Sequence, residues 1–314
     1  MGFARPPSAA PVYSAPNLAP LLDFYASKLP SDTMGRLPSV AAPPYCYYLP
    51  PVGDKALFSP INNITATVRL LELLDFSQYA LTNEPANCGG SMPTDVVSNQ
   101  FIYMPQGNSA SGTRGSAFYR YNILTDAWAT MAAITTLGVS HRFGYNNAVV
   151  WDGSDFIYVF AGYDTVTDQA TFRYSIAGNS WVELADNPDG LYAPSGSGVL
   201  SGDFVYLVFN AGTNRFRRYS ISGDSFANMA NIPFNCNVGS LCQAADDTDK
   251  LYLFGGTVPA GQAARYSISG NSWTTLTATN IPTGDFCKGI YLTDPVNLIL
   301  LPRRGNAQMW VYRV

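Results

Sequence analysis

A segment that recurs along the chain constrains the fold more than any other feature. Each of four clear copies has two short runs of alternating apolar residues and a tyrosine followed seven residues later by a large aromatic: Tyr121 and Trp128, Tyr174 and Trp181, Tyr219 and Phe226, Tyr266 and Trp273. Alternation with a period of two is typical of β-strands. Turns such as Ala177-Gly178-Asn179 lie before the aromatic, where a tight hairpin needs left-handed backbone. Each copy therefore predicts a meander of antiparallel strands.

Fainter copies extend the array toward both ends. Leu73-Leu74-Asp75-Phe76 and Leu21-Leu22-Asp23-Phe24 are expected in the last strand of a copy, and residues 45–50 in the second strand of the first. The aromatic residues then fall at positions 24, 76, 128, 181, 226 and 273, at intervals of 52, 52, 53, 45 and 47 residues. Together with a further short strand before each copy, this period predicts four-stranded units arranged as a propeller.

The two ends of the chain are complementary. Residues 21–30 have the pattern of a fourth strand without the first three, whereas the last copy stops at Val314, before a fourth strand of its own. Pairing of 21–30 with the strand at 305–314 completes a sixth unit and leaves no open sheet edge. The expected organisation is a Pro-rich extended arm over residues 1–20 and one β-propeller over residues 21–314, with 21–30 as the closing strand.

The Gly255-Gly256 pair after a second strand, together with the Tyr/Trp spacing, resembles the kelch-repeat β-propeller family over roughly residues 21–314. Two other copies depart from the glycine pair and have Ala161-Gly162 and Ala211-Gly212. The resemblance implies an all-β, six-bladed kelch-like β-propeller closed by an N-terminal strand that pairs with the C-terminal blade. Propellers of this family serve as adaptors, carbohydrate binders, oxidases and structural parts, so the fold does not choose a function.

Composition excludes several classes of partner. The net charge of −4 disfavours nucleic acid and anionic membranes, both of which need a basic surface. No apolar run reaches the ~18 residues that cross a bilayer, and prolines interrupt the first residues where a signal peptide has its apolar core. The five cysteines form no CxxC pair, which favours reduced, buried thiols. We therefore expect a virion or cytoplasmic protein without a signal peptide or transmembrane segment.

The histidine, aspartate and arginine residues of the sequence do not form a recognisable catalytic motif, and we expect no enzymatic activity. His141 is the only histidine, which excludes a site built on two histidines, and no metal or cofactor is expected. Asp246, Asp247 and Asp249 lack the full spacing of a calcium loop and are expected in a turn. The arginines that precede the repeat tyrosines are expected to have a structural role: Arg120, Arg173, Arg218 and Arg265. A pair of carboxylates in a central channel, as in propeller glycosidases, is left open.

The functional hypothesis is a non-catalytic interaction scaffold. Lys and Glu are scarce and only 13% of residues are charged, about half of the ~25% of ordinary soluble domains, which suits permanent packing in an assembly. We expect a virion component, a phage tail or head-attached protein, that docks on other subunits through its N-terminal arm and its face loops. The alternatives are a carbohydrate-binding, receptor-recognition module and a cytosolic kelch-type adaptor. Three aromatics outside the repeat positions are the candidate interaction residues: Tyr145, Tyr163 and Tyr192.

Overall fold

The structure is a computed structural model in which almost every regular element is a β-strand. Twenty-three strands and one short 3-10 helix are present among the residues that it describes. These residues are 34–36, 46–48, 55–60, 69–72, 78–80, 82, 85, 94, 97–98, 100–107, 115–137, 142–144, 147–162, 169–188, 194–209, 213–236, 240–244, 246–255, 261–277, 289–292, 298–302 and 309–314.

The strands form six antiparallel sheets within the described ranges, five with four strands and one with three. The first two sheets contain β2 (Cys46–Tyr48), β3 (Lys55–Pro60), β4 (Arg69–Glu72) and β5 (Gln78–Ala80), and then β6 (Phe101–Pro105), β7 (Phe118–Asn122) and β8 (Ala127–Met131). The helix η1 (Ile134–Leu137) follows β8. The next two contain β9 (Ala148–Trp151), β10 (Phe156–Phe160), β11 (Thr171–Ser175) and β12 (Ser180–Leu184), and then β13 (Pro194–Ser201), β14 (Phe204–Phe209), β15 (Phe216–Ser220) and β16 (Ser225–Asn228). The last two contain β17 (Ser240–Gln243), β18 (Lys250–Phe254), β19 (Ala263–Ser267) and β20 (Ser272–Leu276), and then β21 (Ile290–Leu292), β22 (Leu298–Pro302), β23 (Met309–Arg313) and β1 (Met34–Arg36).

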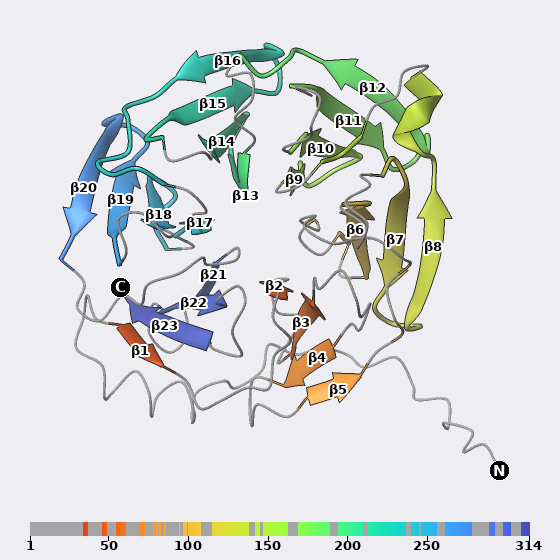
Figure 1. Ribbon diagram of the computed structural model, residues 1–314, viewed down its shortest axis with the longest axis horizontal. Coiled ribbons are helices and arrows are strands. Elements are labelled where there is room, and N and C mark those ends of the chain that lie inside the picture. The colour runs from red at the N-terminus through yellow and green to blue at the C-terminus, as the bar shows by residue number, and fades with distance from the viewer. Residues whose placement is uncertain are drawn as a thin grey trace.

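The sheets have a propeller-like arrangement. They follow one another around a ring in chain order, with the first strand of a sheet nearest the centre and the last strand at the outer rim (Figure 1). β10 and β14, the second strands of their sheets, pack on a neighbouring sheet at both faces and are buried almost throughout. The outer strands β16 and β20 are mostly exposed. The expected all-β class is confirmed.

The repeated aromatic side chains fill the space between neighbouring sheets, as expected. Phe118 of β7 packs on Trp181 of β12 in the next sheet, with ring centroids 4.8 Å apart. Phe216 of β15 packs in the same way on Trp273 of β20, at 4.9 Å. Each such ring removes roughly 150–250 Å² from water. The period in the sequence is therefore the period of inter-sheet packing.

The first sheet differs from the expectation in its boundaries. The segment 45–50 was expected to hold a second strand, but β2 is the first strand of its sheet and β3 pairs with both β2 and β4. Tyr79 of β5 lies opposite Leu70, in the position that Trp181 takes opposite Tyr174. Phe76, the expected aromatic, lies outside the described residues. The physical reason is that the β4–β5 connection is longer than the other hairpins of this type, which moves the paired aromatic along the chain.

Chain ends that are far apart in sequence meet in the last sheet. β1 pairs antiparallel with β23, and Met34, Gly35 and Arg36 lie opposite Tyr312, Val311 and Trp310. The strand that completes this sheet is thus at 34–36. The expected closing strand at 21–30 and the arm over residues 1–20 lie outside the described residues.

The β6–β8 sheet has three strands where four were expected. Val97 forms an isolated bridge with Phe101, and the backbone N–H of Thr94 donates to Tyr103 O at 2.9 Å. These two contacts lie along the free edge of β6, where the first strand of the other sheets pairs. Most of the segment from residue 81 to 100 lies outside the described residues.

Candidate functional site

The two ends of the sheets differ in the connections they carry. Because neighbouring strands are antiparallel, connections between the first and second strands and between the third and fourth strands leave a sheet at one end. We name this the turn end. Connections between the second and third strands, and those that lead to the next sheet, leave at the opposite end, which we name the loop end. These two surfaces are the candidates for recognition.

At the turn end, a repeated aspartate ties two turns of one sheet together. Asp203, before β14, accepts hydrogen bonds from the backbone N–H of Ser222 at 3.0 Å and from the hydroxyls of Ser220 at 3.0 Å and Ser222 at 2.7 Å. Asp155 binds Ser175 Oγ and the N–H of Ala177 in the same way, both at 2.7 Å. These contacts satisfy the polar groups of the turns internally.

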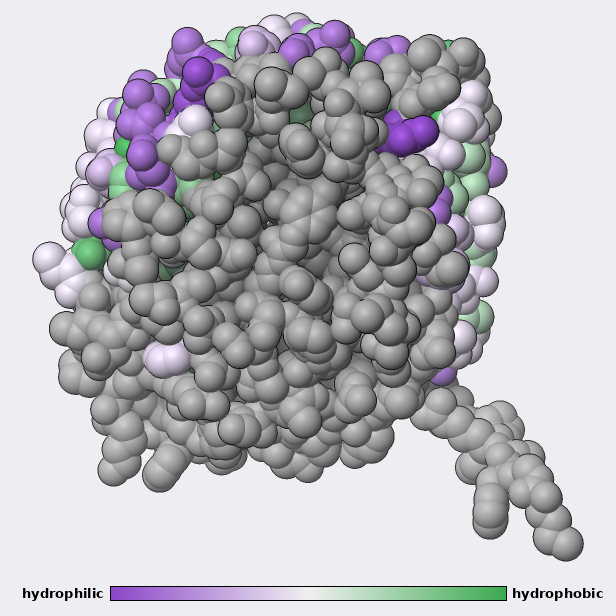
Figure 2. Space-filling model, viewed as in Figure 1, coloured by the Kyte–Doolittle hydropathy of each residue, from purple (hydrophilic) through white to green (hydrophobic). Residues whose placement is uncertain are grey.

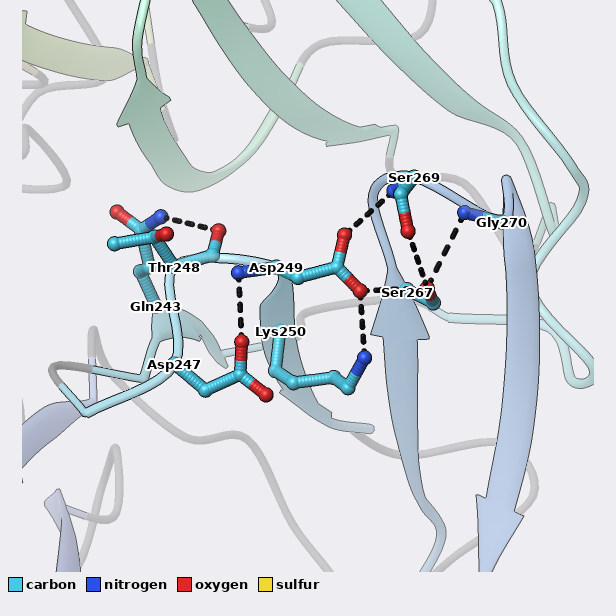
Figure 3. Close-up of polar contacts among 8 residues, drawn as sticks. All are labelled: Gln243, Asp247, Thr248, Asp249, Lys250, Ser267, Ser269 and Gly270. Atoms are coloured by element: carbon cyan, nitrogen blue, oxygen red, sulfur yellow. Dashed lines mark hydrogen bonds and ion pairs between the residues drawn. The ribbon is translucent and has the colours of Figure 1, made fainter.

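Asp249 makes the third of these clasps (Figure 3). Its carboxylate accepts from Ser267 Oγ at 2.8 Å, from the N–H of Ser269 at 2.6 Å and from Lys250 Nζ at 2.6 Å. The Asp247 carboxylate accepts a hydrogen bond of 3.0 Å from the backbone N–H of Asp249 and so stabilises the turn before β18. The expected turn at Asp246, Asp247 and Asp249 is confirmed.

The clasp hydrogen bonds favour the charged form of each carboxylate. The pKa of Asp249 is lowered far below its usual range, first by Lys250 and then by the serine and backbone donors. The pKa of Asp203 is lowered chiefly by the Ser222 hydroxyl, and that of Asp155 chiefly by the Ser175 hydroxyl. These aspartates are therefore ionised at neutral pH.

A second repeated residue joins each sheet to the one before it. Asn179 has a left-handed backbone with φ 45°, and its side-chain oxygen accepts from the Tyr174 hydroxyl at 2.7 Å and from the N–H of Ala132 at 2.9 Å. Ala132 lies just after β8 of the preceding sheet. The equivalent inter-sheet bonds have the following donors and acceptors: Thr82 to Asp126, Ala185 to Asp224 and Ala230 to Asn271. We call these contacts staples.

The aromatic residue of the repeat completes the staple where it is tryptophan. Trp181 Nε1 donates to Ala132 O at 2.7 Å, and Trp273 Nε1 donates to Ala230 O at 2.9 Å. Phe226 has no donor at this position. The staple was not expected from the sequence, although an Asn or Asp stands five residues after the repeat tyrosine in all four clear copies: Asp126, Asn179, Asp224 and Asn271.

The repeated arginines lie against aromatic rings of their own sheet. Arg218 lies over Phe204 with its guanidinium carbon 4.0 Å from the ring centroid. Arg120 lies over Phe101 at 4.5 Å, and Arg173 lies over Phe156 at 4.6 Å. A cation on an aromatic face is held by the ring quadrupole. Arg265, whose sheet has Lys250 in place of the phenylalanine, lies opposite Tyr252 of β18. The ring contacts support the structural role expected for Arg120, Arg173 and Arg218.

At the loop end, backbone hydrogen bonds brace the connections of neighbouring sheets. The N–H of Phe143 donates to Gly115 O at 3.1 Å, and the N–H of Gly162 donates to Phe143 O at 2.8 Å. These bonds link three connections in series. A Cβ at Gly115 would displace the Gln106 side chain, which lies against it. Further braces of 2.8 Å have these donors and acceptors: Asn187 to Gln169, Ile232 to Asn214 and Cys236 to Thr213.

The candidate residues from the sequence all belong to loop-end connections. Tyr145, Tyr163 and Tyr192, like His141, lie outside the described residues. By their positions in the sequence, Tyr145 falls between β8 and β9, Tyr163 between β10 and β11, and Tyr192 between β12 and β13. Among the described side chains at this end are Arg142 and Arg215. The surface over β15 and β16 is hydrophilic (Figure 2).

The described part of the chain contains no group of three or more His, Cys, Asp or Glu side chains that could hold a metal ion. Cys236 and Cys242 are buried thiols. No helix among the residues with described structure has the length and apolar character needed to cross a bilayer.

Comparison with known proteins supports the fold. No protein-family model and no curated protein matches the chain. Among solved structures, a structural genomics protein of unknown function from Bacteroides thetaiotaomicron VPI-5482 is similar, with a TM-score of 0.62 and 12% sequence identity. The similarity covers 91% of this chain and 73% of that chain. At this identity it shows a shared all-β fold alone.

Proposed function

We propose that the six sheets are the blades of one closed, six-bladed β-propeller of the kelch type. Two contacts between the ends of the chain support closure: β1 pairs with β23, and β2 of the first sheet contacts β22 of the last. The staples support the same arrangement, because they join neighbouring sheets in a continuous series from the first to the fifth.

The function that we propose is a non-catalytic interaction scaffold. The observation that supports this proposal is that the repeated polar residues hydrogen-bond within the fold. Clasps and staples engage aspartates such as Asp203 and Asp224 in hydrogen bonds that hold the turns and sheets together. Their repetition in successive sheets fits a role in the fold, since a catalytic site is needed once.

A virion component, such as a phage tail or head-attached protein, is the setting that we propose for this scaffold. The support is compositional: few charged residues, many Ser, Thr, Asn and Gly, and a Pro-rich segment at residues 1–20 that suits docking on a neighbouring subunit. The loop end, with its braced connections, is the second proposed contact. Bracing keeps a recognition surface ordered before binding, which lowers the entropy lost on association.

Carbohydrate recognition is the second candidate, because the connections that contain Tyr145, Tyr163 and Tyr192 all leave their sheets at the loop end. Tyrosine rings can stack on sugar faces and donate hydrogen bonds at their hydroxyls. In this alternative the loop end would bind a cell-surface glycan.

Two measurements separate these proposals. Mass spectrometry of gradient-purified virus particles from the source culture should detect the chain at constant stoichiometry if it is a virion component. Its absence from every particle fraction would rule out that setting. A glycan array with the full chain tests the alternative, with Tyr145→Ala, Tyr163→Ala and Tyr192→Ala as variants. If the chain is monomeric in solution and binds a defined glycan, and the variants lose this binding, the protein is a lectin and the virion proposal is wrong.

A further inference from the structure

One strand of the last sheet comes from a distant part of the chain. Every other pairing in the described sheets joins strands that follow one another in the sequence. β1 instead pairs with β23, so that Gly35 lies opposite Val311. Figure 1 shows β1 along the outer edge of β23, at the rim of the ring. Among the described strands, β1 is therefore the one that a second copy could supply without breaking a connection between paired strands.

The edge of β23 that receives β1 is held in place by other contacts. β22 and β23 pair along five residues, from Leu298 opposite Arg313 to Pro302 opposite Met309. Tyr312 of β23 is 0% exposed, and its ring centroid lies 5.0 Å from that of Phe254 in the fifth sheet. These contacts fix β23 independently of β1. Its outer edge is thus a preformed acceptor for one strand.

β1 is attached to its sheet less firmly than other outer strands. β12 and β20 each pair with the neighbouring strand along five residues and are joined to it by a hairpin. β1 pairs with β23 along three residues, without a hairpin between the two strands. We call the contact between β1 and β23 the seam. A short strand without a hairpin is more easily released by local opening.

Trp310 of β23 further lowers the cost of opening the seam. It lies opposite Arg36 of β1, and its buried Nε1–H has no hydrogen-bond partner. The corresponding groups of Trp181 and Trp273 donate to backbone oxygens of the preceding sheet. A buried donor without an acceptor destabilises the folded state, and it regains a partner when water reaches it. The closed seam therefore contains an unsatisfied group that opening relieves.

The connection from β1 to β2 has a sequence that suits a long reach. Residues 37–45 include Pro38, Pro43 and Pro44. Proline favours extended backbone, in which nine residues span ~28 Å. A connection of this composition can carry β1 away from its own last sheet.

We propose that copies of the chain exchange β1: the strand of one copy pairs with β23 of a second copy, which returns its own β1 to the first. The structure identifies the occupant of the edge, because Met34-Gly35-Arg36 is the sequence paired there and an identical strand forms the same register. Reciprocal exchange closes the assembly at two copies. The proposal deepens the scaffold function and rests on it, since exchange links copies that an assembly holds close together.

Concentration decides between closure within one copy and exchange between two, because both form the same contacts at the seam. A short linker gives β1 an effective concentration of about 1 mM at its own β23 edge. Exchange should therefore be rare in dilute solution. It should become common where copies are packed together.

A pair of cysteines reports which copy supplies β1. Gly35→Cys and Val311→Cys in one full-length chain place thiols on directly opposite residues, whose Cα atoms are about 4.5–5.5 Å apart in an antiparallel pair. A disulfide can bridge this separation. After refolding and oxidation, closure gives an intrachain bond, whereas exchange gives a covalent dimer on a non-reducing gel. Between about 5 µM and about 0.5 mM protein, the fraction of covalent dimer should rise by about tenfold or more.

Arg217→Cys with Asn228→Cys is the matched control, because these residues lie opposite one another in β15 and β16, which a hairpin joins. This pair should form intrachain bonds at both concentrations. Each single variant at the seam measures the dimers that form through the native cysteines. Intrachain bonds alone from Gly35→Cys with Val311→Cys at both concentrations would overturn the exchange. Equal amounts of dimer from the single and double variants would overturn it as well.

The wild-type chain gives a second measurement that needs no added cysteine. Refolded in reductant at about 0.5 mM, it should show a dimer in sedimentation velocity that high salt does not dissociate, because backbone pairing holds the seam. A chain that stays monomeric would contradict the proposal, and so would a dimer that the cysteine pair fails to capture. Neither result touches the scaffold function, which is tested by the presence of the chain in particles.

Discussion

Asn179 and Ala132 are hydrogen-bonded across the space between two sheets, with the Asn179 side-chain oxygen 2.9 Å from the Ala132 nitrogen. The same oxygen accepts the Tyr174 hydroxyl, so one side chain joins a turn, the third strand beside it and the preceding sheet. Asn179 also has a positive φ, which Asn and Asp tolerate better than other residues with a Cβ. This explains why only Asn and Asp occupy the position in the four clear copies.

Replacement of Asn179 should separate these roles. Asn179→Ala removes the acceptor of two hydrogen bonds and places alanine in left-handed backbone, so we expect it to lower the free energy of unfolding by about 2–4 kcal/mol. Asn179→Asp keeps an acceptor and the tolerance of positive φ, as at Asp126 and Asp224, and should change the free energy by less than about 1 kcal/mol. Urea denaturation followed by tryptophan fluorescence measures both. Equal destabilisation by the two variants would contradict the staple.

Acid should destabilise the fold through the clasps. The pKa values of Asp155, Asp203 and Asp249 are lowered from the ordinary value of 3.8, so the unfolded chain binds more protons than the folded chain in acid. The stability that the clasps contribute is therefore present above pH 3.8 and is lost as the pH falls toward the folded pKa values. Melting temperatures measured across this range should fall steeply in the wild-type protein.

Asp203→Asn is the matched variant for the acid experiment. It should be less stable than wild type at neutral pH because the amide has one acceptor oxygen, and it should show a shallower loss of stability in acid. If its pH profile runs parallel to that of the wild-type protein, Asp203 does not contribute to acid unfolding and the clasp has no energetic role there.

Alkali should act through the buried tyrosines. Burial is the main cause that raises the pKa values of Tyr121, Tyr174, Tyr219 and Tyr266 above the ordinary 10.0. The folded chain holds these protons more tightly than the unfolded chain, so stability is complete below pH 10 and declines as the pH rises beyond it. In a titration followed by tyrosinate absorbance, these four groups should ionise together with the loss of the β-sheet circular dichroism signal. Their ionisation in a protein that is still folded would contradict the prediction.

Much of the fold could be predicted from the sequence because the repeated residues are the ones that pack between neighbouring sheets. Tyr174 and Trp181 recur with constant spacing since they lie opposite one another in β11 and β12, and every copy needs that pair to fill an inter-sheet space. Where the spacing changes, the prediction failed. Leu70 and Tyr79 are two residues further apart in the sequence than Tyr174 and Trp181. The pattern predicted Phe76 as the paired aromatic instead of Tyr79.

The staples and the gathering of aspartates at the turn end could not be predicted in the same way. Asn179 has its main partner, Ala132, 47 residues earlier, and no local pattern names a backbone N–H in another sheet. The turn end is recognised only when antiparallel pairing has assigned each connection to one end of its sheet. Aspartates such as Asp203 and Asp224, separate in the sequence, then collect on one surface.

The pairing of β1 with β23 decides how much of the N-terminal segment the fold needs. Val311 and Tyr312 of β23 are 1% and 0% exposed, and Gly35 and Met34 lie opposite them. Deletion of residues 1–36 removes β1 and opens the backbone edge of a buried strand, so we expect a loss of about 3 kcal/mol or more, or aggregation through the free edge. Deletion of residues 1–33 leaves β1 intact and is the matched control, for which we expect cooperative unfolding close to that of the full chain. Thermal unfolding together with light scattering distinguishes the two outcomes. If the shorter deletion already unfolds the protein, residues before Met34 are needed to complete the last sheet, as the sequence pattern at 21–30 predicts.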